Sequence, residues 1–394
     1  MRPAARLQAA IELLDEIIIA ARDNGSAADS LARKFFAGRR YAGSKDRRAV
    51  RNLVWDAIRK FGERPANGRA AFAAMADADT ELAALFDGSN YGPAALTSDE
   101  ARATGGPLPK WMLPLLSVLV DETERAALLE RAPLDIRVNV LKTTCDAVAA
   151  EMAEAERLPA SPNAFRLPTG HPLDRHPMAL SGAVEIQDLG SQLIVDVCGV
   201  KPGMTVLDIC AGAGGKTLAL AAGMKGQGRL IASDTNRNRL DQLGLRVARA
   251  GASGVTESRL LNPGKESSAL AYLDDSCDVA LIDAPCSGSG TWRRNPETRW
   301  RLSPARLERL ISEQARLLDI AAILVRPGGC LVYAVCALTV GEGQQQISEF
   351  LTRHQRWQAE ALEMPIGRKQ GDGLLLTPAH DGTDGFFFAR LRKL

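Results

Sequence analysis

One apolar stretch turns through three glycines straight into a helical pattern, and it constrains the fold more than any other part of the chain. Residues 206–217 read Val-Leu-Asp-Ile-Cys-Ala-Gly-Ala-Gly-Gly-Lys-Thr, and a helical pattern continues to Met224. This order predicts a strand, a tight turn and a helix. Gly212, Gly214 and Gly215 tolerate positive φ and let the backbone approach a ligand, while the first helical turn offers unpaired N–H groups. Such a turn is typical of sites for nucleotide-like cofactors.

Three classes of cofactor site use this kind of turn, and the spacing separates them. A phosphate-binding P-loop needs glycine six residues before its lysine, where this chain has Cys210. A dinucleotide site needs a third glycine where Thr217 stands. The S-adenosylmethionine type remains, in which the turn wraps the amino-acid end of the cofactor and Asp234, after the next apolar stretch, holds the ribose. The alternative is an ordinary turn between a strand and a helix with a capping aspartate.

Length and composition exclude several classes of protein. The chain has 394 residues, 46% of them hydrophobic, so we expect two or three domains with substantial cores. Seven cysteines form no Cys-x-x-Cys pair and there are only four histidines, which argues against a zinc site and for a reducing compartment. The sequence shows neither a secretory pattern nor a stretch long enough to span a bilayer. We therefore expect a cytoplasmic monomer with no metal and no membrane partner.

Residues 1–125 are rich in alanine and leucine with helical periodicity, which predicts a helical bundle. Within it, residues 33–69 hold twelve basic residues against three acidic ones, although the net charge of the whole chain is only +2. Clustered Arg and Lys side chains suit a phosphate backbone, so we predict that this segment contacts RNA, with an ordinary solvated surface as the alternative. The aromatic residues among them are predicted to belong to the core: Phe35, Phe36, Tyr41 and Trp55.

The character of the sequence then changes. Residues 134–140 and 183–186 alternate like strands, and residues 146–156 have a helical pattern. We predict a small α/β subdomain of RRM-like type over residues 126–190. Arg137 and Asn139 are expected on the solvent face of its first strand, with contact to RNA as the alternative.

From residue 191 onward, apolar strands alternate regularly with helical segments. Strands are predicted at 206–210, 229–233, 278–282 and 330–334, and helices include 237–249 and 304–325. The fold class is therefore α/β, with a doubly wound, mostly parallel, Rossmann-like sheet over residues 191–394, as in class I S-adenosylmethionine-dependent methyltransferases. Ligands of such sheets bind at the carboxyl ends of the strands.

Two cysteines and a carboxylate fall at these strand ends. Asp283 and Cys286 follow the strand at 278–282, and Cys336 follows the strand at 330–334. C5 of a pyrimidine is too weak a nucleophile to accept a methyl group unaided. A thiolate that adds to C6 activates C5, and a base must then remove the C5 proton so that the thiol can leave. Two thiols and a carboxyl near N3 suit this chemistry, whereas the alternative is that the cysteines are small buried hydrophobic residues.

At these residues the chain resembles the Nop/Sun family of RNA (cytosine-C5) methyltransferases, and most closely its bacterial small-subunit rRNA methyltransferase B branch. The resemblance covers nearly the whole chain and rests on the segments 187–192, 208–217, 283–288, 293–296 with Trp300, 333–336 and 384–390. It implies a Rossmann-like S-adenosylmethionine-dependent methyltransferase domain, preceded over residues 1–125 by an all-α NusB-like RNA-binding domain.

The resemblance also implies roles for individual residues. Cys336 would be the nucleophile that attacks C6, Cys286 would assist proton removal and release of the product, and Asp283 would lie against the cytosine and the methyl end of the cofactor. Arg293, Arg294 and Asn295 would guide the RNA strand. The residues that would bind S-adenosyl-L-methionine are Cys210, Ala211, Gly212, Ala213, Gly214, Gly215, Lys216, Asp234, Asn262 and Asp283.

Three positions depart from the family pattern. Val335 stands where the family usually has threonine before its nucleophile, and Gly212-Ala213 stands where it usually has Ala-Pro. Asn262 occupies the place of the acid expected near the adenine, which predicts weaker cofactor binding at most.

The sequence thus predicts an enzyme that moves a methyl group from S-adenosylmethionine to C5 of a cytosine, with 16S rRNA as the expected substrate. One alternative is a tRNA (cytosine-C5) methyltransferase, and another is a non-catalytic RNA-binding ribosome assembly factor on the same fold. A third is methylation of DNA cytosine, for which the nucleophile would be Cys286 instead of Cys336.

Overall fold

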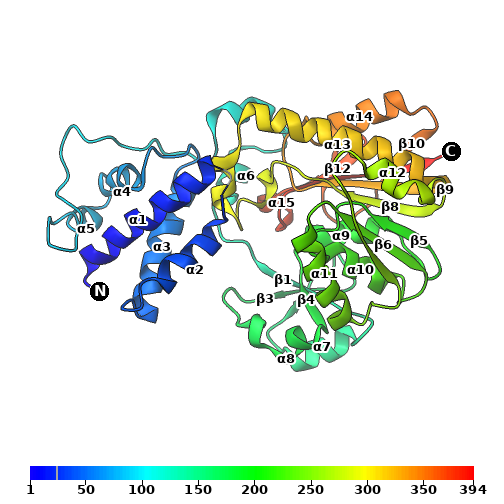
Figure 1. Cartoon of the computed structure of the whole chain (residues 1–394), viewed down its shortest axis with the longest axis horizontal. Helices are drawn as coiled ribbons and strands as arrows, with labels where there is room; N and C mark the ends of the chain where they lie inside the picture. Colours follow the sequence, from blue (N-terminus) through cyan, green and yellow to red (C-terminus); the bar gives the residue numbers. More distant parts are fainter. Residues whose placement is uncertain (24) are drawn as a thin grey trace. The chain divides into compact units, whose positions relative to one another are not determined.

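The computed structural model describes residues 1–23 and 25–394, which form two compact units. The first unit comprises Met1–Glu130 and Thr291–Pro304, and the second comprises Arg131–Gly290 and Ala305–Leu394. Figure 1 draws the elements of both units. The three domains expected from the sequence stay a prediction, but residues 291–304 pack with the helical unit although they lie within the range 191–394 assigned to the cofactor domain.

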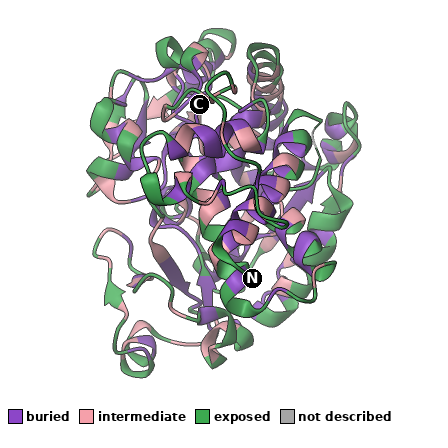
Figure 2. Cartoon of the chain, turned by 90° about the vertical axis from the view of Figure 1, so that its left-hand side faces the viewer, coloured by how far each residue is buried: buried purple, intermediate pink, exposed green. Residues whose placement is uncertain are grey.

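The first unit is a bundle of helices whose buried faces follow helical spacing. In α1, for example, Leu7, Leu14 and Ile17 are fully buried because residues three, four and seven apart share one face of a helix. Figure 2 colours buried residues purple. The helices are α1 (Pro3–Arg22), α2 (Ala28–Ala37), α3 (Ser44–Lys60), α4 (Gly68–Ala76), α5 (Thr80–Ala83), the 3₁₀ helix η1 (Lys110–Leu115), α6 (Glu122–Ala127) and the 3₁₀ helix η5 (Pro296–Arg301).

The helix η5 anchors the segment 291–304 in this bundle. Arg299 is buried and donates to the carbonyls of Ile58, Arg59 and Pro107, while Trp300 Nε1 donates to Phe61 O at 2.7 Å. The last carbonyls of a helix lack partners within the helix, so these side chains complete the end of α3. Burial, and then the charge of Arg59, lower the pKa of Arg299 to about 10.

The second unit contains a small antiparallel sheet with the strand order β2-β3-β1-β4. The strands and helices predicted in this region are confirmed in their approximate positions. The elements are β1 (Leu134–Val138), α7 (Cys145–Glu151), β2 (Glu156–Arg157), β3 (Ala164–Leu167), the 3₁₀ helix η2 (Leu173–Arg175), α8 (Pro177–Ser181) and β4 (Val184–Ile186).

The prediction that Arg137 of β1 and Asn139, which directly follows β1, face solvent is wrong. Arg137 is only 4% exposed and Asn139 only 2% exposed. Arg137 Nε donates to Gln187 Oε1 at 2.7 Å, and Asn139 Nδ2 donates to the carbonyls of Gly182 and Ala250 at 2.9 Å each. These two side chains therefore face neither solvent nor RNA, because they pair with polar groups distant in sequence.

Within the described residues the larger sheet has nine strands in the order β11-β12-β13-β9-β8-β5-β6-β7, with β10 paired to β13. Strands β5 to β9 are parallel, and β10 to β13 are antiparallel, so the sheet is mixed and not mostly parallel as predicted. The strands are β5 (Thr205–Asp208), β6 (Arg229–Asp234), β7 (Thr256–Leu260), β8 (Cys277–Asp283), β9 (Val325–Val335), β10 (Trp357–Glu360), β11 (Arg368–Gln370), β12 (Gly373–Leu376) and β13 (Phe386–Lys393).

Helices cover both faces of this sheet. Figure 1 shows α9, α10 and α11 on one face, and α13 and α14 on the other. The chain runs from β5 to β6 and β7 on one side and returns to β8 and β9 on the other, so the order reverses between β5 and β8, where ligands of such sheets bind. The helices are α9 (Leu189–Cys198), α10 (Gly215–Gly223), α11 (Arg237–Ala250), α12 (Glu266–Leu270), η3 (Ala271–Leu273), η4 (Ser289–Thr291), α13 (Pro304–Leu324), α14 (Gln344–Arg353) and α15 (Pro378–Asp381).

Residues 1–23 and 25–394 contain neither a membrane-spanning helix nor a cluster of metal ligands. None of the helices in this part of the chain is both long and apolar enough to cross a membrane. The same residues contain no group of three or more His, Cys, Asp or Glu side chains that could hold a metal ion.

Candidate active site

The glycine turn connects β5 to α10, as predicted, and its glycines serve two different purposes. Gly212 and Gly214 have φ of 56° and 91°, in the left-handed region that favours glycine. A Cβ on Gly214 would lie 2.1 Å from Leu243 Cδ1 of α11, whereas Gly212 and Gly215 face open space. Gly214 therefore permits close packing of the turn against α11, and the other two leave backbone accessible to a ligand.

Asp234 ends β6, the neighbour of β5, and its carboxylate fixes the turn. Oδ2 accepts from the Gly212 N–H at 2.8 Å, and Oδ1 accepts from the Asn236 N–H at 2.7 Å. A carboxylate oxygen can accept more than one hydrogen bond, so both oxygens remain able to bind ribose hydroxyls. The open turn and this carboxylate fit the amino-acid end and the ribose of S-adenosylmethionine. Asn262 lies in the exposed loop after β7, and its contact with the adenine stays a prediction.

The parallel strands β8 and β9 bring the two predicted catalytic cysteines together. Asp283 pairs with Ala334 across these strands, so the segments that follow leave the sheet at the same edge. The Sγ atoms of Cys286 and Cys336 are 3.3 Å apart, within hydrogen-bond distance. Both side chains are partly accessible, whereas Cys198, Cys277 and Cys330 are buried.

The state of the Cys286 thiol depends on its partner. Its pKa is raised well above the usual value, first by the hydrogen bond with Cys336, then by burial, and then by the charges of Cys336 and Glu342. The resting protein therefore keeps Cys286 protonated.

Asp283 forms an ion pair that the sequence did not predict. Lys216 Nζ of α10 lies 2.7 Å from Asp283 Oδ2 at the end of β8. Burial lowers the pKa of Lys216, but the charge and hydrogen bond of Asp283, together with the charges of Cys336 and Asp208, make the net shift upward. The pair links the glycine turn to the strand that precedes Cys286, so Lys216, one of the residues predicted to bind the cofactor, contacts Asp283, one of the residues predicted to be catalytic.

Asp208, beneath the turn, gives stability an expected pH dependence. It is fully buried, accepts from Thr217 Oγ1 at 2.7 Å, and burial raises its pKa to about 7. In the unfolded chain an aspartate carboxyl has a pKa of about 3.9. Between about pH 3.9 and about pH 7 the folded state therefore binds more protons at Asp208 than the unfolded state does. The free energy of unfolding falls as pH rises toward and through 7. Relative to Asp208→Asn, the wild type should lose roughly 1 kcal/mol of unfolding free energy between pH 6 and pH 8. Urea unfolding of both proteins at the two pH values measures this, and equal losses would contradict it.

Three buried polar residues near the thiols were not singled out from the sequence. Glu342, Gln314 and Ser289 are each 0% exposed. Glu342 follows Cys336 by six residues and lies in the loop before α14, where a charged residue would ordinarily be solvated. The sequence carries no sign of this burial, because it depends on hydrogen bonds to the loop after β8.

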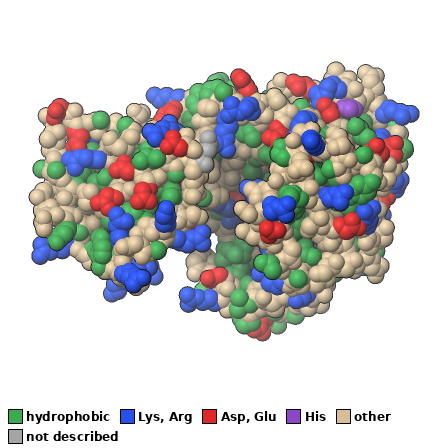
Figure 3. Space-filling view, viewed as in Figure 1, with side chains coloured by type: hydrophobic (Ala, Val, Ile, Leu, Met, Phe, Trp, Pro, Cys, Tyr) green, Lys and Arg blue, Asp and Glu red, His purple; other side chains and the backbone are tan. Residues whose placement is uncertain are grey.

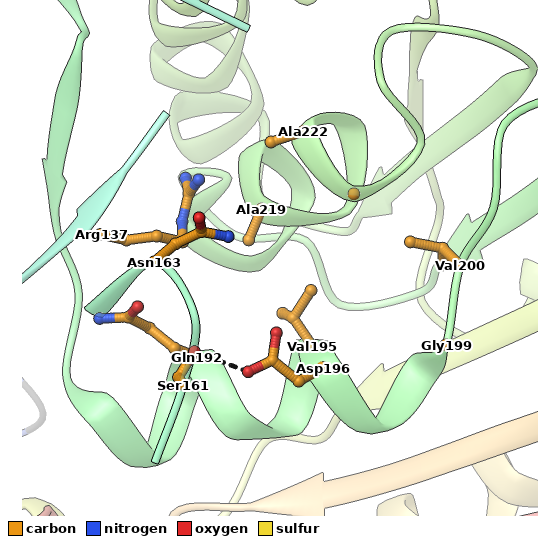
Figure 4. A pocket seen from close by; sticks show the side chains of 11 residues that line it. Arg137, Ser161, Asn163, Gln192, Val195, Asp196, Gly199, Val200, Ala219 and Ala222 are labelled. Atoms are coloured by element: carbon orange, nitrogen blue, oxygen red, sulfur yellow. Dashed lines mark hydrogen bonds between the residues drawn. The ribbon is translucent and has the colours of Figure 1, made fainter. Parts of the chain in front are cut away.

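A separate cavity of about 140 Å³ lies where the small sheet packs on α9 and α10. Figure 4 shows Arg137, Asn163 and Asp196 at its wall, with the hydrogen bond of 2.7 Å that Ser161 Oγ donates to Asp196. Burial raises the pKa of Asp196. None of the predicted site residues is among the described residues that line this cavity, so it is distinct from the site of the thiols.

The turn after β5, the acid after β6 and the reactive side chains after β8 and β9 define a class of protein, the Rossmann-like S-adenosylmethionine-dependent methyltransferases. The family model of the 16S rRNA methyltransferase RsmB/F matches residues 197–392. The probable ribosomal RNA small subunit methyltransferase B of Synechocystis sp. is 34% identical over 302 residues, which are 72% of this chain and 66% of that protein. The aligned part is thus slightly less than two thirds of that relative.

Solved structures agree in fold. The crystal structure of PH0851 covers 98% of this chain and 99% of its own, with a TM-score of 0.77 and 21% identity. A methyltransferase homolog from Pyrococcus horikoshii covers 71% of this chain and 92% of its own, with a TM-score of 0.62 and 27% identity. The chain belongs to the RsmB/F branch of the Nop/Sun family, and its cofactor is S-adenosylmethionine. The predicted family, fold class and cofactor are confirmed.

Proposed function

We propose that this protein methylates C5 of a cytosine in RNA, and that its substrate is 16S rRNA. The observation that carries the proposal is the pair of thiols 3.3 Å apart at the ends of β8 and β9. Methylation at C5 needs one thiolate for C6 and a second group for the C5 proton, which a pair of thiols provides. The family and the name of the Synechocystis relative support small-subunit rRNA as the substrate.

Cys336 is the proposed nucleophile. Its sulfur bonds to C6, and the electrons of the C5=C6 double bond become available at C5, which accepts the methyl group. The bound cofactor supplies that group as an electrophilic methyl on a sulfonium. Asp283 is the residue assigned to N3 of the cytosine, where a carboxyl group favours the adduct, and Lys216 fixes its orientation.

Cys286 is assigned to product release. A base takes the C5 proton, the electron pair of the C5–H bond re-forms the C5=C6 double bond, and the C6–S bond breaks to release the Cys336 thiolate. While Cys336 is bonded to carbon, the hydrogen bond and the charge that raise the pKa of Cys286 are absent. The Cys286 thiol then gives up its own proton more readily, and its thiolate can accept the proton from C5.

The turn and the ends of β6 and β7 hold the cofactor in this proposal. Backbone of the turn contacts the amino-acid end, Asp234 contacts the ribose, and Asn262 contacts the adenine. Asn262 can accept a hydrogen bond from the adenine amino group, but it lacks the negative charge of the acid that the family usually has there. We therefore expect S-adenosylmethionine to bind more weakly than it would with an acid at this position. The residues of the turn are Cys210, Ala211, Gly212, Ala213, Gly214, Gly215 and Lys216.

The helical unit supports RNA as the substrate. Figure 3 shows Lys and Arg side chains gathered along the lower edge of this unit. Phe35 and Phe36 belong to the core, as predicted, whereas Tyr41 is 71% exposed, so its predicted burial is wrong. Of the residues predicted to guide the RNA, Arg293 is buried and Asn295 is exposed. The exposed basic residues of segment 33–69 are Arg33, Lys34, Arg40, Lys45, Arg47, Arg48, Arg51, Lys60 and Arg64.

Such a surface neutralises phosphates without reading sequence, while the target base leaves its stack to reach the thiols. We propose that residues 1–125 form a NusB-like RNA-binding domain and that residues 126–190 form an RRM-like subdomain. Together they would present loop or single-stranded RNA to the catalytic unit.

Transfer of labelled methyl groups from S-adenosylmethionine tests this function. Unmodified small-subunit rRNA and bulk tRNA serve as separate substrates, and the labelled nucleoside is identified after digestion. We expect 5-methylcytidine in the rRNA. Label in tRNA alone would reassign the substrate, a different labelled nucleoside would reject the chemistry, and cofactor binding without label in either RNA would favour an assembly factor.

A further inference from the structure

One buried carboxylate connects the loops that carry the two thiols. Glu342 Oε1 accepts from the Ser287 N–H at 2.7 Å, one residue after Cys286. Glu342 Oε2 accepts from Thr339 Oγ1 at 2.8 Å, three residues after Cys336. The main chain of Glu342 is held as well, because Tyr333 OH donates to its carbonyl at 2.8 Å. A single side chain thus fixes the loop after β8 to the loop after β9.

Gln314 of α13 extends this connection to the other side of Cys286. Its Nε2 donates to Pro285 O at 2.9 Å and to Glu342 Oε1 at 3.2 Å. The residues immediately before and after Cys286 are therefore both tied to one buried pair. Displacement of either side chain would let the Cys286 backbone move.

Further hydrogen bonds join the same two loops without Glu342. Ser289 Oγ accepts from the Leu338 N–H at 2.9 Å, and the Gly290 N–H donates to Cys336 O at 3.0 Å. The loops thus keep part of their connection when the carboxylate is altered, so a substitution of Glu342 can change the placement of Cys286 without unfolding the unit.

We propose that Glu342 is a positioning residue for product release, which holds Cys286 beside the Cys336 sulfur during removal of the C5 proton. This inference rests on the proposed function, because it assumes the release role of Cys286. Glu342 acts through Cys286 and touches neither the base nor the cofactor in this assignment. Proton transfer requires donor and acceptor within hydrogen-bond distance, so even a small displacement of Cys286 slows the step.

Glu342 also acts on Cys286 through its charge, an effect that an uncharged residue with the same hydrogen bonds would not have. The charged groups that raise the pKa of the Cys286 thiol are Cys336 and the Glu342 carboxylate. Cys286 in turn raises the pKa of the buried Tyr333 hydroxyl. Replacement by glutamine keeps the size of the side chain but removes the charge. The pKa of Cys286 should therefore fall in Glu342→Gln.

The first test separates release from methyl transfer. In Glu342→Gln we expect multiple-turnover methylation to fall by about 10- to 100-fold and a covalent protein–RNA adduct to accumulate, while a single round of methyl transfer changes little. Gln314→Leu should have the same effect. In a Cys286→Ala background, Glu342→Gln should have no further effect, because the residue through which it acts is gone. Additive losses in this double variant would overturn the proposal.

A matched control shares the burial of Glu342 but not its contacts. Gln346 is buried in α14 and donates to Ile311 O at 2.8 Å. Gln346→Leu removes a buried hydrogen bond between α14 and α13 that involves neither of the two loops, and it should leave the ratio of release to transfer unchanged. An adduct in this control would show that general loosening of the unit is sufficient, and it would overturn the specific role of Glu342.

The second test needs no RNA and remains informative if the proposed function fails. In protein that carries Cys336→Ala, the pH dependence of Cys286 alkylation by iodoacetamide is followed by mass spectrometry of its peptide. Adding Glu342→Gln should shift the midpoint to lower pH, because a negative charge beside the thiol is removed. An unchanged midpoint would overturn the electrostatic link. A shifted midpoint, together with the absence of an adduct in Glu342→Gln protein that retains Cys336, would instead reject the release role of Cys286.

Discussion

Replacement of Cys336 by alanine is expected to abolish methyl transfer to RNA, to below about 10⁻³ of the wild-type rate, because C5 of cytosine is not activated without addition to C6. Incorporation of labelled methyl groups into small-subunit rRNA measures this loss. Binding of S-adenosylmethionine should persist, since the glycine turn and Asp234 lie at the ends of other strands, β5 and β6.

Cys330→Ala supplies the matched control for this loss. Cys330 belongs to the same strand, β9, but is buried in the core of the sheet. It should retain most of the activity, so a comparable loss in both variants would point to damage to β9. An active Cys336→Ala variant together with an inactive Cys286→Ala variant would instead assign the nucleophile to Cys286, as in the enzymes that methylate DNA cytosine.

Cys286→Ala should show the opposite pattern, with attack preserved and release blocked. Cys336 can still add to C6 and C5 can still accept the methyl group, but the C5 proton has lost its acceptor 3.3 Å from the Cys336 sulfur. Loss of a general base costs about 10²- to 10⁴-fold in rate, so turnover should fall by this amount while a protein–RNA adduct accumulates. Denaturing electrophoresis with labelled RNA detects the adduct.

The double variant Cys286→Ala/Cys336→Ala identifies the sulfur in that adduct. It should give no slowly migrating band, because the proposed bond to C6 is made by Cys336. A band that persists in the double variant would place the bond on another residue. Absence of a band in Cys286→Ala itself would reject the division of labour between the two thiols.

The parts of the fold that could be predicted are those encoded over short distances. The apolar run before the glycines gives β5, and the same reasoning locates β6, β8 and β9 within a few residues. In a sheet of this kind, neighbouring parallel strands present their carboxyl ends together, so Asp283, Cys286 and Cys336 could be expected at one edge before the structure was known. Their roles stay predictions, whereas their proximity is observed.

The parts that could not be predicted depend on partners distant in sequence. Arg137 alternates with apolar neighbours as a solvent-facing residue would, but its partner Gln187 lies 50 residues away. Glu342 has the sequence context of a surface loop and is buried because Ser287, 55 residues earlier, needs an acceptor. The antiparallel strands β10 to β13 are formed by pairing with β9 and with one another, which local periodicity does not encode.

The packing of the segment 291–304 against residues 1–130 limits how the sequence of this protein can change during evolution. Arg299 and Trp300 satisfy the carbonyls of Ile58, Arg59 and Phe61, yet they are encoded between the codons for Cys286 and Cys336. A recombination event that exchanged residues 1–130 alone would leave the buried Arg299 guanidinium without matched carbonyl acceptors. A substitution at the end of α3 therefore has to be compatible with the residues of η5. We expect these two segments to coevolve.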